Sequence, residues 1–384
     1  MAETVEKLIA KLVSLATVSR DSNLELIEFL CNYLSKHGIE SHLVPNSDGD
    51  KANLYATVGP MTEGGVVLSG HTDVVPVDGQ PWTSDPFTLV KSNGRLYGRG
   101  TADMKSFCAV ALALVPEMLA RGLQRPIHLA FSYDEEVGCV GVPGLIERIV
   151  TELPAPRAVV VGEPTSMRVV TAHKSLTGLE TTVIGHEAHS AQTHRGVSAV
   201  MNAARLVTFL ADVARENASG SPSATSFEPP YSTIHVGTIK GGTAVNIISR
   251  ECRLEWDIRC IPEDDPHVFI DRFTTYCREE ILPGMHAVAP EADVVTRILY
   301  SSPALRPEPD GAAESLAKQL TGRNATDAVA YLAEAGQFQE AGFSTVVCGP
   351  GSIDQAHQPD EYIELSQVQE CVDFMRRLIE IQAA

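Results

Sequence analysis

The chain has 384 residues, 44% of them hydrophobic, and it is longer than the ~250–300 residues at which a single core stops growing, so two domains are expected. Its 30 Lys and Arg against 49 Asp and Glu give a formal net charge of −19, which repels phosphate backbones and anionic lipid. Nucleic acid and membrane are therefore poor partners, and no apolar run reaches the ~20 residues of a membrane span.

The cysteines and the N-terminal stretch both favour a cytoplasmic protein. The eight cysteines are scattered singly without a CxxC pair, which fits reduced thiols better than a disulfide framework. Residues 1–18 carry charges through their first half and lack the apolar core of a signal peptide. Their apolar side chains instead have the spacing of one helical face: Val5, Leu8, Ile9, Leu12 and Val13.

Helix-like and strand-like segments alternate from residue 3 to about residue 174. Amphipathic helices are predicted at the N-terminus and at 22–38, and a further helix at 104–119. Short apolar runs predict strands at 53–58, 64–70, 127–133 and 157–163. Val- and Leu-rich strands that alternate with helices indicate a mostly parallel sheet with helices on both faces.

The stretch from residue 176 to residue 299 has a different pattern. The expected elements are a strand at 178–185, a helix at 198–217, strands at 231–239, 243–249 and 252–261, a helix at 267–282 and a strand at 286–299. This order is close to β-α-β-β-α-β. We expect an inserted α+β, ferredoxin-like domain over 176–299, within a catalytic α/β domain made of 1–175 and 300–384 and closed by a helix at 368–382.

Candidate metal ligands stand where the predicted strands end, or in the turns that follow. Because the carboxyl ends of parallel strands meet at one edge of a sheet, these side chains should lie together. Histidines and carboxylates without a cysteine suit a pair of zinc-like cations that share one carboxylate. The sequence therefore predicts a metallohydrolase, with ligands among His71, Asp103, Glu136, Glu163 and His357.

Two further acids accompany these ligands. Asp73 lies two residues after His71, so in an extended segment both side chains point the same way and Asp73 can hold the far ring nitrogen. Glu135 and Glu136 are neighbours that face opposite directions on a strand, so one can bind a cation while the other acts as general base. Each signal has a plainer alternative when taken singly: His71 as a core histidine, Asp103 as a helix N-cap, or the paired glutamates as an exposed turn.

The order of the motifs SGHTDVVPV, GRGTADMK, SYDEEVGC, VVGEPT, GHEAHSAQTHRGVSAV, GGTAVNIIS, DIR and GPGSIDQAHQPDEYI resembles the zinc-dependent aminoacylase and exopeptidase family. This family contains acetylornithine deacetylases, to which the likeness is strongest, and succinyl-diaminopimelate desuccinylases. The resemblance implies two zinc ions, with cobalt as an alternative. His71, Asp103 and Glu163 would hold one ion. Asp103, Glu136 and His357 would hold the other, and Asp103 would bridge them.

The resemblance also implies roles outside the metal ligands. Glu135 would be the general base and acid. The inserted domain would form a homodimer through its helix and edge strand and move over the site. His189 would reach the developing oxyanion from a partner subunit, while Asn246 and Arg259 would contact the substrate. From the residues alone, His189 could equally be a surface histidine, and Arg259 could pair with a neighbouring aspartate.

This chain departs from the family pattern at two places. Ser106 stands where relatives usually have Gly, and this change should not disturb the metals. Leu332 and Ala333 replace a usual Gly-Thr before Glu334, which could otherwise be expected to meet the substrate's side-chain ammonium.

The expected reaction is hydrolysis of the amide of N2-acetyl-L-ornithine to ornithine and acetate, a step of arginine biosynthesis. Glu135 would take a proton from a zinc-bridging water and return it to the leaving amine. Alternatives with the same chemistry are succinyl-diaminopimelate, N-acetylcitrulline or a dipeptide as substrate. An alternative from another class is a catalytically silent amino-acid-binding protein.

Overall fold

The computed structural model describes residues 2–220 and 226–384, and the chain divides into two compact units. Unit 1 comprises Met1–Ala172, Leu305–Ala328 and Ala333–Ala384. Unit 2 comprises His173–Ala304 and Val329–Leu332. Unit 1 contains all the predicted metal ligands.

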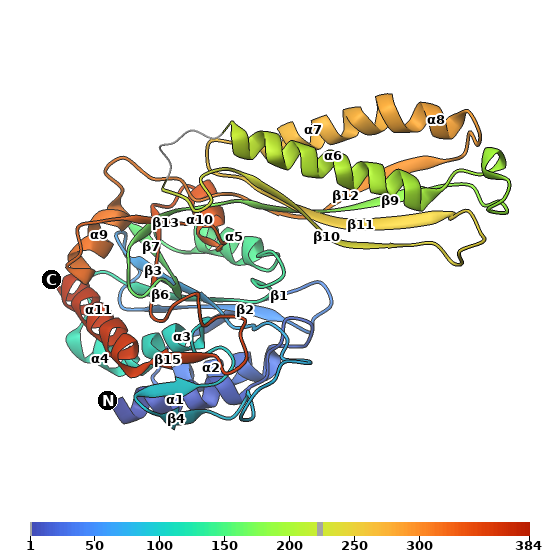
Figure 1. Cartoon of the computed structure of the whole chain (residues 1–384). Helices are drawn as coiled ribbons and strands as arrows, with labels where there is room; N and C mark the ends of the chain where they lie inside the picture. The colour runs from blue at the N-terminus through green and yellow to red at the C-terminus, as the bar shows by residue number, and fades with distance from the viewer. Residues whose placement is uncertain (1, 221–225) are drawn as a thin grey trace. The chain divides into compact units, whose positions relative to one another are not determined.

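Unit 1 is built on a sheet with the order β1-β2-β6-β3-β7-β14-β8-β13 (Figure 1). The central strands β6, β3, β7 and β14 run parallel, whereas β1, β2 and β8 pair antiparallel with their neighbours. The central strands are buried along their whole length because helices cover both faces. The strands are β1 (Ser41–Pro45), β2 (Ala52–Val58), β3 (Val66–His71), β6 (Ile127–Ser132), β7 (Ala158–Pro164), β8 (Val170–His173), β13 (Asp327–Val329) and β14 (Thr345–Gly349).

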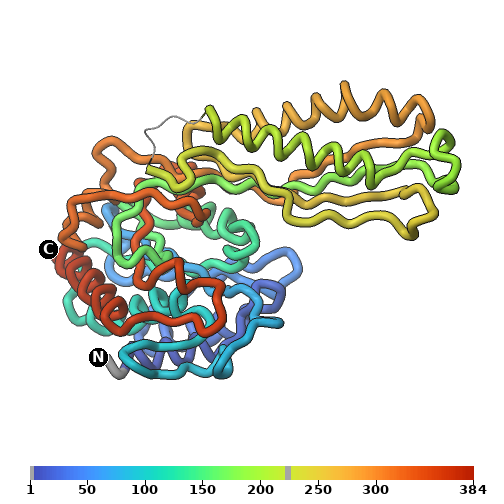
Figure 2. The backbone as a smooth tube through the Cα atoms, in the orientation of Figure 1, coloured from blue at the N-terminus to red at the C-terminus, as the bar shows by residue number. Residues whose placement is uncertain are grey.

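Helices α5 and α10 lie against one face of this sheet, and α3 lies against the other (Figure 1). Every residue of α3 is buried, because α1 and α11 pack on its outer side. The C-terminal helix α11 thus lies beside the early helices α3 and α4 (Figure 2). The helices are α1 (Ala2–Ser14), α2 (Leu24–Lys36), α3 (Lys105–Ala113), α4 (Val115–Arg121), α5 (Val142–Glu152), α9 (Ala312–Thr321), α10 (Ala335–Glu340) and α11 (Leu365–Ala383).

A small antiparallel sheet in unit 1 joins two distant parts of the chain. Its strands β4 (Val90–Ser92), β5 (Arg95–Tyr97) and β15 (Tyr362–Glu364) have the order β15-β5-β4. The register places Tyr97 opposite Tyr362. The loop that follows β5 therefore lies beside the loop that precedes β15.

Unit 2 is an antiparallel sheet with helices on one face (Figure 1). The strand order β10-β11-β9-β12 and the chain order β-α-β-β-α-β are those of a ferredoxin-like fold. Its elements are β9 (Leu176–Ile184), the short 3-10 helix η1 (Thr193–Arg195), α6 (Ala199–Ser219), β10 (Thr233–Gly241), β11 (Glu251–Arg259), α7 (Pro266–Tyr276), the π-helical turn η2 (Cys277–Ile281), α8 (Leu282–His286) and β12 (Asp293–Ser302). The predicted α/β fold class with an inserted α+β domain is confirmed.

The strand predicted at 243–249 is wrong. This segment is a loop whose only ladder contact among the described residues is an isolated bridge between Ile247 and His189. Among its apolar side chains only Ile248 is buried, whereas Val245 is fully exposed and Ile247 is 41% exposed. β-branched residues in a short run therefore gave a strand signal that the unit's packing does not use.

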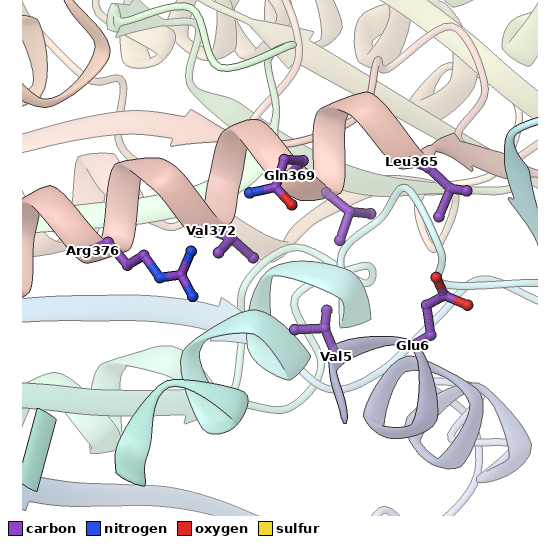
Figure 3. A pocket seen from close by; sticks show the side chains of 7 residues that line it. Val5, Glu6, Leu365, Gln369, Val372 and Arg376 are labelled. Carbon is purple, nitrogen blue, oxygen red and sulfur yellow. The ribbon is translucent and has the colours of Figure 1, made fainter. Parts of the chain in front are cut away.

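A partly apolar pocket of about 250 Å³ lies between α1 and α11 (Figure 3). Its lining consists of Val5, Glu6, Leu365, Val368, Gln369, Val372 and Arg376. None of these is a predicted site residue, so the pocket is separate from the candidate chemistry. In the described part of the chain, no helix is long and apolar enough to cross a membrane.

Candidate metal centre

The parallel strands deliver the predicted ligands to one edge of the unit 1 sheet. His71 is the last residue of β3, and Glu163 lies near the end of β7. Glu136 stands in the turn after β6, and His357 in the loop after β14. Asp103 precedes Met104, the N-cap residue of α3. Segments far apart in the sequence thus end at the same place, as expected of an open α/β sheet.

Asp103 lies between two histidines. Its Oδ1 is 2.9 Å from His71 Nε2, and its Oδ2 is 3.4 Å from His357 Nε2. His71 Nε2 is also 3.6 Å from Glu163 Oε1, and His357 Nε2 is 2.9 Å from Glu136 Oε2. The two oxygens of one carboxylate therefore face two separate groups of ligands, which is the arrangement expected of a bridging carboxylate.

The cluster holds more negative charge than its own side chains can balance. His71, Asp103 and Glu163 are buried. Oε1 of Glu163 has no hydrogen-bond partner among the described residues. Burial and then Asp103 raise the pKa of Glu163 well above its ordinary value, and the same two causes raise that of Glu136 to about 7. Buried carboxylates with unsatisfied oxygens fit divalent cations, which would neutralise the charge and occupy the free oxygens.

The ligand atoms are close enough to share ions. Two groups each have their ligand atoms within 4.8 Å of one another: His71 with Glu135 and Glu163, and His71 with Asp103 and Glu136. The ion-pair distances divide the residues differently, around His71 and around His357, with Asp103 in common. We favour the second division because it includes both histidines. The individual ligand assignments stay predictions.

The two histidines respond to their acidic surroundings. The carboxylates of Asp103 and Glu136 raise the pKa of His357 to about 10. Burial would lower the pKa of His71, but Asp103 and Glu163 together raise it well above its ordinary value. Both shifts arise because the imidazoles supply the positive charge that the carboxylates need. A cation would take over that task and leave both rings neutral, as ligands must be.

Asp73 is engaged differently from the prediction. Nδ1 of His71 makes its short contact, 2.9 Å, with the backbone carbonyl of Asp73, while the carboxylate Oδ1 is 3.6 Å away. The carboxylate instead accepts hydrogen bonds from the backbone N–H groups of Glu135 and Glu136 and from Ser19 Oγ. Asp73 therefore fixes the histidine tautomer through its main chain and holds the glutamate turn through its side chain.

Glu135 is buried beside the ligands. Its Oε1 accepts a weak hydrogen bond from the thiol of Cys139 at 3.1 Å. Burial, and then Glu136 and Asp103, raise the pKa of Glu135 to about 8. A carboxyl group whose pKa lies near neutrality can both accept and return a proton, so the environment suits a general base.

Glu334 is buried behind β3 and β6. Its Oε1 accepts a hydrogen bond from Ser69 Oγ at 2.5 Å, and its Oε2 accepts one from Ser132 Oγ at 2.8 Å. Both oxygens are thus already engaged by serines of the two strands. The contact between Glu334 and a substrate ammonium stays a prediction. The two hydrogen bonds also join β3, which ends at His71, to β6.

The remaining predicted site residues belong to unit 2. His189 and Asn246 lie together, because Ser190 N donates to the carbonyl of Asn246 and Ile247 bridges to His189. Both side chains are exposed. Arg259 ends β11, and its Nε lies 3.7 Å from Asp257 Oδ1. The ion pair that the sequence offered as an alternative for Arg259 is therefore present, and the substrate contacts stay predictions.

Sequence reasoning missed the residues that hold the ligands in place. Ser19 supports Asp73, and Ser69 and Ser132 support Glu334. Arg99 and Glu361 form a buried ion pair next to Asp103. Signals were available only for the last two, as charged residues within GRG and PDEY, the motifs that also contain or adjoin predicted ligands.

Histidines and acids that meet at the carboxyl edge of an α/β sheet, with carboxylate oxygens left unsatisfied, fit a metal-dependent hydrolase. A profile of the peptidase family M20/M25/M40 matches residues 67–381. The acetylornithine deacetylase of Proteus mirabilis (strain HI4320) is 35% identical over 94% of this chain and 90% of its own length. The chain therefore belongs to the M20 family and is an amidohydrolase, which confirms the resemblance seen in its motifs.

Solved structures share the fold at lower sequence identity. The M20 family metallo-carboxypeptidase Sso-CP2 of Sulfolobus solfataricus matches with a TM-score of 0.78 and 17% identity, over 99% of each chain. The YXEP protein of Bacillus subtilis, described as a dinuclear metal binding peptidase from the M20 family, matches with a TM-score of 0.67 and 15% identity, over 99% of this chain and 98% of its own. At these identities the likeness supports the fold alone.

Without cations, the folded protein should lose stability as the pH rises from about 4.5 toward 8. The pKa values of Glu135 and Glu136, about 8 and about 7, lie above the ordinary 4.5. In this window the folded state keeps protons that the unfolded state has lost. The stabilisation that these protons provide is complete below the pKa of the unfolded state, and it is lost as the pH rises through the pKa of the folded state. Urea unfolding of chelator-treated protein at a pH of about 5.5 and about 8 measures this loss of stability.

The matched control is the same protein loaded with zinc. Bound cations replace the missing protons, so the midpoint of the loaded protein should exceed that of the cation-free protein by more at the higher pH. A gap that is equal at both pH values, or that narrows, would contradict the charge imbalance described above.

Proposed function

We propose that this amidohydrolase removes the acetyl group from N2-acetyl-L-ornithine by means of two divalent cations, with zinc as the first choice and cobalt as the alternative. The observation that carries the proposal is the buried Glu135 beside an Asp103 carboxylate that faces both His71 and His357. The named substrate is supported by the 35% identity to an acetylornithine deacetylase. The proposed role is a step of arginine biosynthesis.

The cations, once held by the predicted ligands, would supply Lewis acidity that makes the attacking water more acidic and polarises the acetyl carbonyl. Glu135 takes a proton from that water on its carboxylate. It later delivers this proton to the leaving amine nitrogen as the amide C–N bond breaks, so the proton balance closes on one residue. Nearby positive charge would bring the pKa of Glu135 down from about 8, to a value at which the carboxylate form can accept the proton.

The residues of unit 2 supply the contacts that the proposal needs for the rest of the substrate. The imidazole of His189 and the amide of Asn246 can donate hydrogen bonds to an oxygen that becomes negative during the reaction. The guanidinium of Arg259 suits the α-carboxylate of an amino acid. In this proposal His189 acts on the substrate held by a partner subunit.

Glu135→Gln should lower kcat by about 10²- to 10⁴-fold, because the amide keeps the shape of the side chain but cannot accept the proton. Metal analysis of the same sample should still find both cations. Glu136→Gln is the matched control on the adjacent residue: it should weaken cation binding, and excess metal should restore part of its activity. Wild-type turnover by Glu135→Gln would rule out the proposed general base.

Substrate preference is tested by amine release at one fixed metal loading. We expect the kcat/KM for N2-acetyl-L-ornithine to exceed those for succinyl-diaminopimelate, N-acetylcitrulline and a dipeptide by at least about tenfold, a difference of about 1.4 kcal/mol in transition-state binding. A higher value for one of the other compounds would keep the amidohydrolase chemistry and replace the substrate.

We also propose that unit 2 forms a homodimer through α6 and the edge strand β10. Exposed apolar side chains support this: Val200 and Met201 on α6, Ile239 on β10, and Val245 in the loop between β10 and β11. The edge of β10 is also open to pairing within its sheet.

The seven buried cysteines are free thiols, which supports the proposal of a cytoplasmic location.

Sedimentation velocity should find dimers of the wild-type protein and monomers of a Met201→Asp variant, because a charge placed in an apolar interface remains without solvent or a partner. Met61→Asp is the control, as Met61 is an exposed methionine of unit 1. Monomers of the wild-type protein at every concentration, or dimers of Met201→Asp, would contradict this interface.

A further inference from the structure

A buried ion pair that none of the steps above uses lies next to the metal cluster. Arg99 and Glu361 are each only 1% exposed, and Arg99 Nη1 lies 2.7 Å from Glu361 Oε2. Burying two charges is costly unless further hydrogen bonds satisfy their remaining donors and acceptors. The partners that these two side chains do find are therefore informative.

The Glu361 carboxylate binds the backbone of the loop that contains Asp103. Its Oε1 accepts from the N–H groups of Ala102 and Asp103 at 2.8 and 3.1 Å. Its Oε2 accepts from Gly100 N at 3.0 Å as well as from Arg99. Four donors thus converge on a single carboxylate, and one of them is the backbone of Asp103 itself. This fixes the direction in which the Asp103 side chain leaves the loop.

Arg99 extends the same network to the loop that contains His357. Its Nη2 donates to Gln80 Oε1 at 2.6 Å, and Gln80 Nε2 donates to the backbone carbonyl of His357 at 3.0 Å. The guanidinium also lies over the ring of Trp82, at 5.1 Å from its centroid, and Trp82 Nε1 donates to the same Gln80 oxygen at 3.0 Å. The planar fork of arginine makes both contacts at once, which a lysine ammonium cannot reproduce in the same geometry.

We propose that the Arg99–Glu361 pair is a positioning pair. It fixes the positions of Asp103 and His357 relative to each other. It thereby tunes the cation site made by Asp103, Glu136 and His357 more than the site that contains His71 and Glu163. The proposal rests on the dinuclear centre of the proposed function. Hydrogen bonds that orient ligands from behind commonly change metal affinity by about 10- to 100-fold when they are lost.

The β5–β15 strand pair provides a matched control. Arg95 Nε and Glu364 Oε1 form an ion pair across these two strands at 2.9 Å, whereas Arg99 and Glu361 lie just outside them. The control pair is partly exposed and contacts neither the loop of Asp103 nor the loop of His357. Glu364→Gln therefore removes the same charge close to Glu361 in the sequence without touching the metal cluster. Any effect found only in Glu361→Gln belongs to the network around Asp103.

The experiment is a cobalt titration of the chelator-treated protein, followed by visible absorption and checked by metal analysis. In Glu361→Gln, one oxygen becomes an NH₂ group that faces N–H donors. We expect the Kd of one cobalt to rise about 10- to 100-fold, with altered absorption bands, and the Kd of the other cobalt to change less. Glu364→Gln should match the wild type.

Two further variants keep the test decisive if Glu361→Gln folds poorly. Arg99→Lys should weaken the same cobalt as Glu361→Gln does. Gln80→Met should weaken that cobalt alone, because Gln80 supports the carbonyl of His357 and makes no contact with Asp103. Circular dichroism of the cation-free proteins verifies that each variant is folded.

Two wild-type cobalt affinities in folded Glu361→Gln and Gln80→Met would overturn the positioning pair. An equal loss of both cations, repeated in Glu364→Gln, would overturn it as well, since that pattern reflects general destabilisation. A wild-type protein that binds fewer than two cations would instead overturn the dinuclear centre, so the two failures are distinguishable.

Discussion

The carboxylate of Asp103, placed between His71 and His357, is the constraint on which the rest of unit 1 depends. The ends of strands that are far apart in the sequence meet around it, in a cluster of buried acids that repel one another. Such a cluster cannot hold itself in place. It is held because the strands and α3 behind it form a continuous apolar core, which transmits strain instead of relaxing around it.

The acids around Asp103 fall into two groups, which differ in the hydrogen bonds that their carboxylate oxygens accept. Asp73, Glu334 and Glu361 each accept hydrogen bonds from backbone N–H groups or hydroxyls, so their charge is already solvated by the protein. Glu163 has an oxygen without a partner among the described residues, and Glu135 has only a weak thiol donor. Only the second group has carboxylate oxygens left for cations or protons.

The gathering of the predicted ligands at one edge of the sheet could be predicted from the sequence. It depends on one local property, namely where each buried strand ends. Apolar runs give the strands, and a parallel sheet aligns their carboxyl ends. The contacts of Asp73 and Glu334 could not be predicted in this way. They depend on main-chain donors of the 133–136 turn and on serines of neighbouring strands, which are close only after folding. The failed strand at 243–249 has the same origin, since propensity does not indicate whether a core lies nearby.

The comparisons distinguish the chemistry of this chain from its specificity. Peptidases at 15–17% identity share the fold, while the relative at 35% identity is an acetylornithine deacetylase. A fold that supports several substrates cannot select among them, and a metal cluster acts on any amide carbonyl that reaches it. Selection must therefore come from residues outside the cluster. Glu334, one of the predicted substrate contacts, is fully buried, and its two carboxylate oxygens already accept hydrogen bonds from Ser69 and Ser132. A substrate ammonium would therefore have to displace those serines from the carboxylate of Glu334 before it could bind there.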